Sequence, residues 1–91
     1  MAIKKYQDLD NNHIKALIFK ENIDMSGVYK WTNLINAKLY RGFSINLSKR
    51  FLKYYNDNLL AKNNMLISKA ILKYGRANFS NEILEYYSSK M

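Results

Sequence analysis

The chain has 91 residues, which is enough for one domain with a small hydrophobic core. It contains no cysteine, which excludes disulfide bonds and thiolate metal sites as the means of holding the fold. It has no apolar run long enough to cross a bilayer, so we expect no membrane partner. The formal net charge of +8 favours a polyanionic partner instead.

The positive charge is concentrated in the middle of the sequence. Residues 1–26 carry four lysines and four acidic residues, whereas residues 27–78 carry ten basic residues and one acid, Asp57. Most of the basic residues are lysines, and a genome rich in A and T would give a similar composition without any binding role. Such a bias would act evenly along the chain, so the segregation of charge favours a nucleic-acid partner.

The first 25 residues are neutral and rich in asparagine, and we expect them to form an N-terminal extension in front of the domain. Asn12 has the chemistry of a helix N-cap, and the residues after it have helical apolar spacing. The segment therefore predicts one short helix that precedes the main fold.

A β-hairpin is predicted next. Residues 27–32 alternate and are rich in β-forming residues, residues 33–36 have turn chemistry at both ends, and residues 38–41 form the returning strand. With this loop, Tyr29 lies directly opposite Tyr40 on one side of the sheet. Paired aromatic residues also stabilise hairpins by about 0.2–1 kcal/mol without any further role, so pairing alone does not require a function.

Two helices and a third strand follow. Ser44 or Asn46 is expected to cap a helix that ends near Asn56, and a second helix is expected over residues 65–74. Residues 79–87 form the third strand candidate. The order β-β-α-α-β predicts an α+β domain with a small antiparallel three-stranded sheet flanked by helices on one side.

Four residues could form a phosphate site. Arg50 lies on the helix after the hairpin, and Tyr54 lies one turn further along the same helix face. Together with Tyr29 and Tyr40, these side chains could converge on one phosphate, because a guanidinium grips phosphate with its planar fork and stays charged.

Aromatic and basic residues of the same stretch would add base stacking and phosphate contacts. The residues expected to supply these nucleic-acid contacts are Trp31, Lys38, Lys49, Lys53, Lys62, Lys69 and Lys73.

The motifs Gly27-Val28-Tyr29 and Leu39-Tyr40-Arg41-Gly42, followed by the run from Ser44 to Arg50, resemble the GIY-YIG nuclease family. The spacing agrees, because Tyr40 stands 11 positions after Tyr29 and Arg50 stands 10 positions after Tyr40. The amino-acid sequence of residues 26–56 looks most like that of the homing endonucleases encoded in group I introns of fungal mitochondria. The resemblance implies a GIY-YIG fold over residues 26–91, a mitochondrial location and DNA as the family's substrate.

By this resemblance, Tyr29 is the general base, Tyr40 positions water or metal, Arg50 stabilises the scissile phosphate, and Tyr54 takes a position held by His or Tyr in the family. The implied chemistry is phosphodiester hydrolysis assisted by Mg²⁺, if the domain is active. A phenol has an ordinary pKa of about 10, so Tyr29 needs a neighbouring cation to act as a base at neutral pH.

The sequence departs from the family pattern at the metal ligand. The family's metal-binding glutamate is expected roughly twenty residues after Gly75, beyond Met91, so the domain looks truncated. Glu82 and Glu85 belong to the strand motif, and Asp57 is a poor substitute. We therefore expect no metal ligand in this chain, which leaves its activity as an enzyme uncertain.

Two smaller departures lie in the hairpin. Arg41 stands where the second motif usually has an apolar residue, on the strand face opposite the tyrosines. We expect that face to pack beneath the helices, where an unpaired charge is costly. Ala37 replaces the usual glycine of the turn, which costs little unless its φ angle must be positive.

Three functions remain open from the sequence. The chain is an active or once-active homing endonuclease domain, a nucleic-acid-binding module without cleavage, or a catalytically inactive structural subunit of an RNA-protein assembly such as the mitochondrial ribosome. In the last case the partner is RNA, and residues 1–25 serve as a contact arm.

Overall fold

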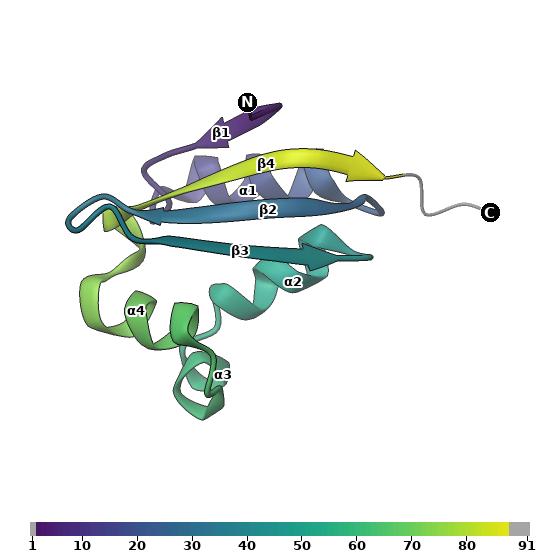
Figure 1. Cartoon of the computed structure of the whole chain (residues 1–91). Helices are drawn as coiled ribbons and strands as arrows, with labels where there is room; N and C mark the ends of the chain where they lie inside the picture. Colours follow the sequence, from purple (N-terminus) through teal and green to yellow (C-terminus); the bar gives the residue numbers. More distant parts are fainter. Residues whose placement is uncertain (1, 88–91) are drawn as a thin grey trace.

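The computed structural model describes residues 2–87. In chain order, the elements are β1 (Lys4–Tyr6), α1 (Asn12–Asn22), β2 (Ser26–Asn33), β3 (Leu39–Ser44), α2 (Leu47–Tyr54), α3 (Asp57–Lys62), α4 (Leu66–Tyr74), a 3₁₀ turn η1 (Arg76–Asn78) and β4 (Phe79–Tyr87). The strands form one antiparallel sheet in the order β1-β4-β2-β3 (Figure 1). The expected α+β class and antiparallel sheet are confirmed, but the expected number of three strands is wrong, because the sheet has four.

The fourth strand comes from the N-terminal segment. β1 pairs with β4, and the amide of Ile3 continues the ladder by donating to the carbonyl of Ile83 at 2.8 Å. Leu9 and Ile18 from the same segment are fully buried in the common core. The segment is therefore part of the domain rather than an extension in front of it, and its described residues do not form a free contact arm.

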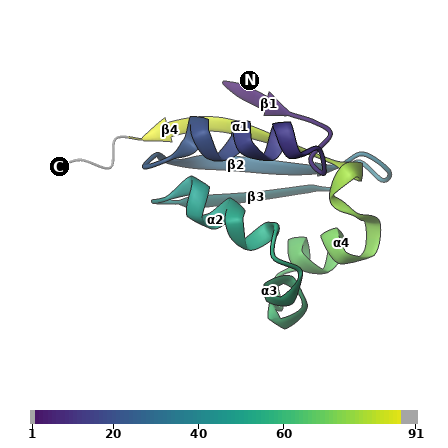
Figure 2. The same cartoon turned by 180° about the vertical axis from the view of Figure 1, so that it is seen from behind.

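Helix α1 begins one residue earlier than expected. Its N-cap is Asn11, whose side-chain oxygen accepts hydrogen bonds from the amides of His13 and Ile14 at 2.8 and 3.2 Å. These bonds satisfy two of the amides that a helix N-terminus leaves unpaired. Figure 2 shows α1 lying across β4 and β2. Ile18 of α1 is fully buried and belongs to the core cluster.

The β2–β3 hairpin has a different register from the one predicted. Tyr29 lies opposite Gly42, and Trp31 lies opposite Tyr40. The loop is displaced by one residue because Asn33 remains in the strand, where its side-chain oxygen accepts from the amide of Ile35 at 2.9 Å. The two tyrosines are therefore diagonal neighbours on one face of the sheet rather than direct partners.

The turn of this hairpin places Ala37 at a φ of 63°. Glycine adopts this left-handed conformation without a steric cost, whereas a residue with a β-carbon is strained by about 1–2 kcal/mol. The replacement of glycine at this position is therefore not neutral.

The helices after the hairpin agree with their sequence signals. Asn46 caps α2 through a bond from the amide of Lys49 at 3.1 Å, and Met65 precedes α4, which ends at Gly75. The short helix α3 was not predicted, because Asn56 was interpreted only as the end of the preceding helix. The Asn56 side chain in fact caps α3 by accepting a hydrogen bond from the amide of Leu59. No helix within residues 2–87 is long and apolar enough to span a membrane.

The helices cover the face of the sheet that carries Tyr29 and Trp31. Phe51 of α2 and Ile71 of α4 pack with both residues in one core cluster. Arg41 lies on the opposite face, where it is exposed to solvent. The expectation that Arg41 would be covered by helices is therefore wrong, and its charge carries no burial cost.

Candidate nucleic-acid interface

Three of the four expected phosphate-site residues lie close together where α2 packs on the sheet. They are Tyr29 of β2 and Arg50 and Tyr54 of α2. The hydroxyl oxygens of Tyr29 and Tyr54 are 2.7 Å apart, and Nη1 of Arg50 donates to the Tyr29 oxygen at 3.5 Å. Both phenols are nearly inaccessible, with 3% and 2% of their surfaces exposed. The two buried phenols therefore lie on the core side of the guanidinium and orient it through the hydrogen bond to Tyr29. Arg50 itself remains partly exposed.

The position of Tyr29 depends on a close approach to the neighbouring strand. Its ring lies over Gly42, where a β-carbon would be only 2.5 Å from Cζ of the ring and closer still to the hydroxyl oxygen. On its other side the ring meets the edge of Phe51, with centroids 5.2 Å apart. A residue without a side chain is therefore required at position 42 for the phenol to reach Arg50.

The protonation states of this cluster follow from burial. Burial raises the pKa of Tyr54, and the hydrogen bond with Tyr29 raises it further, although the Arg50 guanidinium opposes both effects. Burial lowers the pKa of Arg50, but the two neighbouring phenols outweigh it, and the net pKa is raised. At neutral pH the cluster is thus a neutral Tyr54 beside a permanent cation.

Tyr40 does not join this cluster. Its ring packs against Phe79, with centroids 6.4 Å apart, and it lies opposite Trp31 in the hairpin. Within residues 2–87, no hydrogen bond connects it to Tyr29 or Arg50. The displaced register accounts for this, because Tyr40 lies opposite Trp31, two residues along β2 from the expected partner Tyr29.

Trp31 lies in the core and cannot stack on bases. None of its surface is exposed, and its ring packs against Tyr54 and Phe79 with centroid distances of 5.3 and 5.9 Å. The expected role of Trp31 in nucleic-acid binding is therefore wrong. Its place on the tyrosine side of β2 was anticipated, but the helices cover that side.

The expected lysines are exposed and lack acidic partners among residues 2–87. They belong to three regions: the β2–β3 loop with Lys38, the adjoining helices α2 and α3 with Lys49, Lys53 and Lys62, and helix α4 with Lys69 and Lys73. The middle group lines surface hollows together with Arg50, whereas the α4 lysines lie outside the hollows described below.

A first hollow of about 330 Å³ lies at the N-terminal half of α2. Three of its lining residues are cations, and the others are neutral. The lining residues are Ser44, Ile45, Asn46, Lys49, Arg50 and Lys53. The amides at the start of a helix carry partial positive charge, which adds to the field of these cations. Ser44 and Asn46 were singled out in the sequence as helix caps and not as part of a binding surface.

The side chains around Arg50 do not fit Mg²⁺. This ion requires oxygen ligands, usually carboxylates, in octahedral geometry. The cluster offers two phenol side chains and a cation, while Glu82 pairs with Lys30 at 3.4 Å and Asp57 pairs with Arg76. In the part of the chain from 2 to 87, no group of three or more His, Cys, Asp or Glu side chains could hold a metal.

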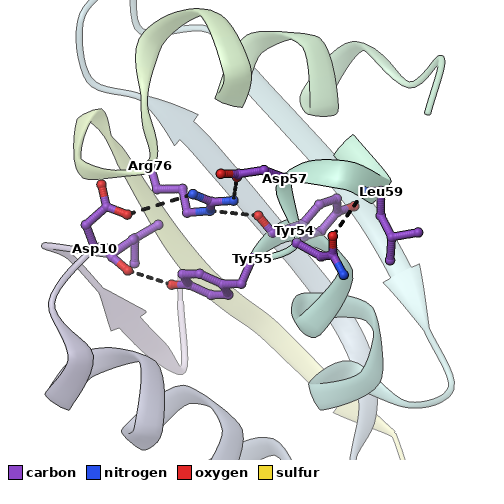
Figure 3. A network of polar contacts seen from close by, with 8 residues as sticks. Asp10, Tyr54, Tyr55, Asp57, Leu59 and Arg76 are labelled. Atoms are coloured by element: carbon purple, nitrogen blue, oxygen red, sulfur yellow. Dashed lines mark hydrogen bonds and ion pairs between the residues drawn. The ribbon is translucent and has the colours of Figure 1, made fainter. Parts of the chain in front are cut away.

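A separate polar network holds the end of α2. Nε of Arg76 donates to the carbonyl of Tyr54 at 2.8 Å, and its guanidinium pairs with Asp57 and, at 4.0 Å, with Asp10. The hydroxyl of Tyr55 donates to the carbonyl of Leu9 at 2.9 Å. Figure 3 shows these contacts joining the N-terminal segment, α2 and η1. The role of Arg76 could not be predicted from local patterns, because its partners are distant along the chain.

No family model matches the chain. No solved structure matches it at a significant level. The motif resemblance therefore stays a prediction, and residues 2–87 form an α+β domain with four antiparallel strands and helices on one face of the sheet.

Proposed function

We propose that this chain binds nucleic acid through the basic surface of α2 and α3. The observation that carries the proposal is the first hollow, which Lys49, Arg50 and Lys53 line together and whose lining includes no acidic residue. Two lysines outside this surface have acidic partners: Lys4 pairs with Glu21, and Lys30 pairs with Glu82. Unpaired cations grouped around one hollow are suited to phosphate groups, which supply the missing negative charge.

The buried phenols that contact Arg50 restrict the orientation of its guanidinium on this surface. An arginine that is held by hydrogen bonds loses less side-chain entropy when it binds a phosphate, because its fork is already oriented. Lys49 and Lys53 lie on the same helix and are exposed, so they act as mobile point charges around the fixed guanidinium. The contrast between one oriented guanidinium and two mobile ammonium groups predicts that Arg50 determines the position of the bound phosphate.

The proposal includes a family origin. The order of the motifs, together with the meeting of Tyr29, Tyr54 and Arg50, supports descent from a GIY-YIG homing endonuclease of a mitochondrial intron, with DNA as the ancestral partner. The separation of Tyr40 from the cluster and the additional strand β1 are departures from what we expected. Because the cluster does not fit Mg²⁺, we propose binding by residues 2–87 and not cleavage.

Binding should weaken steeply with salt. Three phosphate contacts give a slope of roughly −0.9 for each contact, so affinity should fall about fortyfold between 50 and 200 mM KCl. The double variant Lys49→Ala/Lys53→Ala should retain only the Arg50 contact and lose about fourfold over the same range. Fluorescence anisotropy with a labelled DNA duplex at several salt concentrations measures both slopes.

The double variant Lys5→Ala/Lys20→Ala is the matched control, because it removes the same charge from exposed residues outside α2 and α3. It should keep the slope of the unmodified chain. If affinity does not change with salt, or if both double variants change the slope equally, the α2–α3 surface is not the binding site.

Incubation with supercoiled plasmid and Mg²⁺ should leave the plasmid intact, because residues 2–87 contain no group of three or more His, Cys, Asp or Glu side chains that could hold the ion. Agarose gel electrophoresis measures the fraction of nicked circles. The Arg50→Ala variant, which lacks the central guanidinium, is the reference for background nicking. Nicking that requires Mg²⁺ and disappears in Arg50→Ala would contradict the proposal and identify the domain as an endonuclease.

A further inference from the structure

A second hollow adjoins the first, and Lys53 lines both of them. It measures about 440 Å³ and lies among α2, α3 and α4. Lys53 and Lys62 provide positive charge at this hollow, and Leu59 provides an apolar wall. Asn64 contributes an exposed amide that makes no hydrogen bond within residues 2–87. This lining differs in kind from the first hollow, which is mainly cationic.

One buried group at this hollow lacks a partner. Ser68 on α4 is one of the residues around the hollow, it is fully buried, and its hydroxyl makes no hydrogen bond within residues 2–87. A buried polar group normally has a partner, because leaving it unpaired costs free energy. Ser68 therefore places an unpaired polar group beside the hollow.

The combined chemistry matches one nucleotide. A phosphate needs cations such as Lys53 and Lys62, the face of a base needs an apolar wall, and the edge of a base needs amide or hydroxyl partners. A phosphate alone would not require an apolar contact such as Leu59 or a neutral amide such as Asn64. A base inside a duplex cannot enter a hollow of this kind, because its edge is paired and its faces are stacked.

We propose that the second hollow holds a single unpaired nucleotide of the strand whose neighbouring phosphate lies at Arg50. This inference rests on the proposed nucleic-acid binding and narrows the partner to single-stranded or locally unpaired nucleic acid. Lys53, which lines both hollows, bridges the two successive contacts along the strand.

The test compares a short labelled DNA strand without self-complementarity with its own duplex, at one low salt concentration, by fluorescence anisotropy. The strand should bind about tenfold more tightly than the duplex, which is the size expected for one stacked base. The variant Leu59→Ala/Asn64→Ala should remove this preference without a change in charge, and duplex affinity should stay within about twofold.

The matched control is Leu72→Ala/Asn12→Ala, which changes the same residue types at exposed positions outside the hollow, and it should keep the preference. Ser68→Ala separates binding from folding, because it should lower strand affinity several-fold without lowering the melting temperature measured by circular dichroism. Equal affinity for strand and duplex, unaffected by these variants, would overturn the inference and leave the binding proposal standing. If neither probe binds, both proposals are overturned.

Discussion

Replacing Gly42 with alanine is expected to displace the ring of Tyr29 and to lower the free energy of unfolding by about 3 kcal/mol. The new β-carbon would lie 2.5 Å from Cζ of Tyr29, far inside an ordinary van der Waals contact. The ring cannot move aside freely, because Phe51 and Tyr54 contact it and only 3% of its surface is exposed. Urea unfolding followed by circular dichroism measures the loss of stability.

The same substitution in a Tyr29→Leu background is the control. A leucine leaves room where the phenol stood, so Gly42→Ala should then cost less than about 1 kcal/mol, and the difference between the two backgrounds measures the coupling. Nucleic-acid affinity should fall in Gly42→Ala as well, because Arg50 loses its hydrogen bond to Tyr29. Equal costs of Gly42→Ala in the two backgrounds would show that the Tyr29 ring does not lie over position 42.

Replacing Arg76 with alanine should lower the free energy of unfolding by a similar amount, about 2–3 kcal/mol. Its guanidinium is mostly buried and donates to the Tyr54 carbonyl, and removing it leaves that carbonyl and Asp57 without their partner. Hydrogen bonds that involve a charged group contribute about 1.5–3 kcal/mol, while its pair with the half-exposed Asp10 adds little. Thermal unfolding and a separate urea titration measure the change in the free energy of unfolding.

Arg41→Ala provides the comparison for this prediction, because Arg41 is an exposed arginine on the open face of the sheet. Its replacement should change stability by less than about 0.5 kcal/mol. Arg76→Lys should recover part of the loss, because an ammonium keeps the charge near Asp57 but cannot reproduce the planar set of donors. If Arg76→Ala and Arg41→Ala are equally stable, the network shown in Figure 3 does not hold the end of α2.

The helices of this fold were largely predictable because their signals are local. Asn46 is followed by a helical apolar stripe, and the four-residue spacing of Arg50 and Tyr54 fixes both on one helix face. The bounds of β4 agreed with the expected strand over residues 79–87. β1 was missed because three residues are too few to show alternation, and its pairing joins Lys4 to Ile83 across most of the chain.

The candidate site was only partly predictable, for two physical reasons. Alternation places Tyr29 and Trp31 on one face of a strand, but it does not determine which face the helices cover, so Trp31 was expected at the surface and is buried. The pairing register was also wrong by two residues, because it depends on the hydrogen bond that Asn33 makes to the loop. Side-chain bonds of this kind decide where a turn begins, and no periodic pattern reveals them.

The position of β4 has a consequence for how the protein forms. This strand lies between β1 and β2 and is the last of the four in chain order, so the sheet cannot be completed until the ribosome has released residues 79–87. The pairings of β4 join distant parts of the chain, and contacts of such high contact order close slowly. The nascent chain therefore exposes the edges of β1 and β2 throughout synthesis, and its folding depends on a late, concerted insertion of one strand.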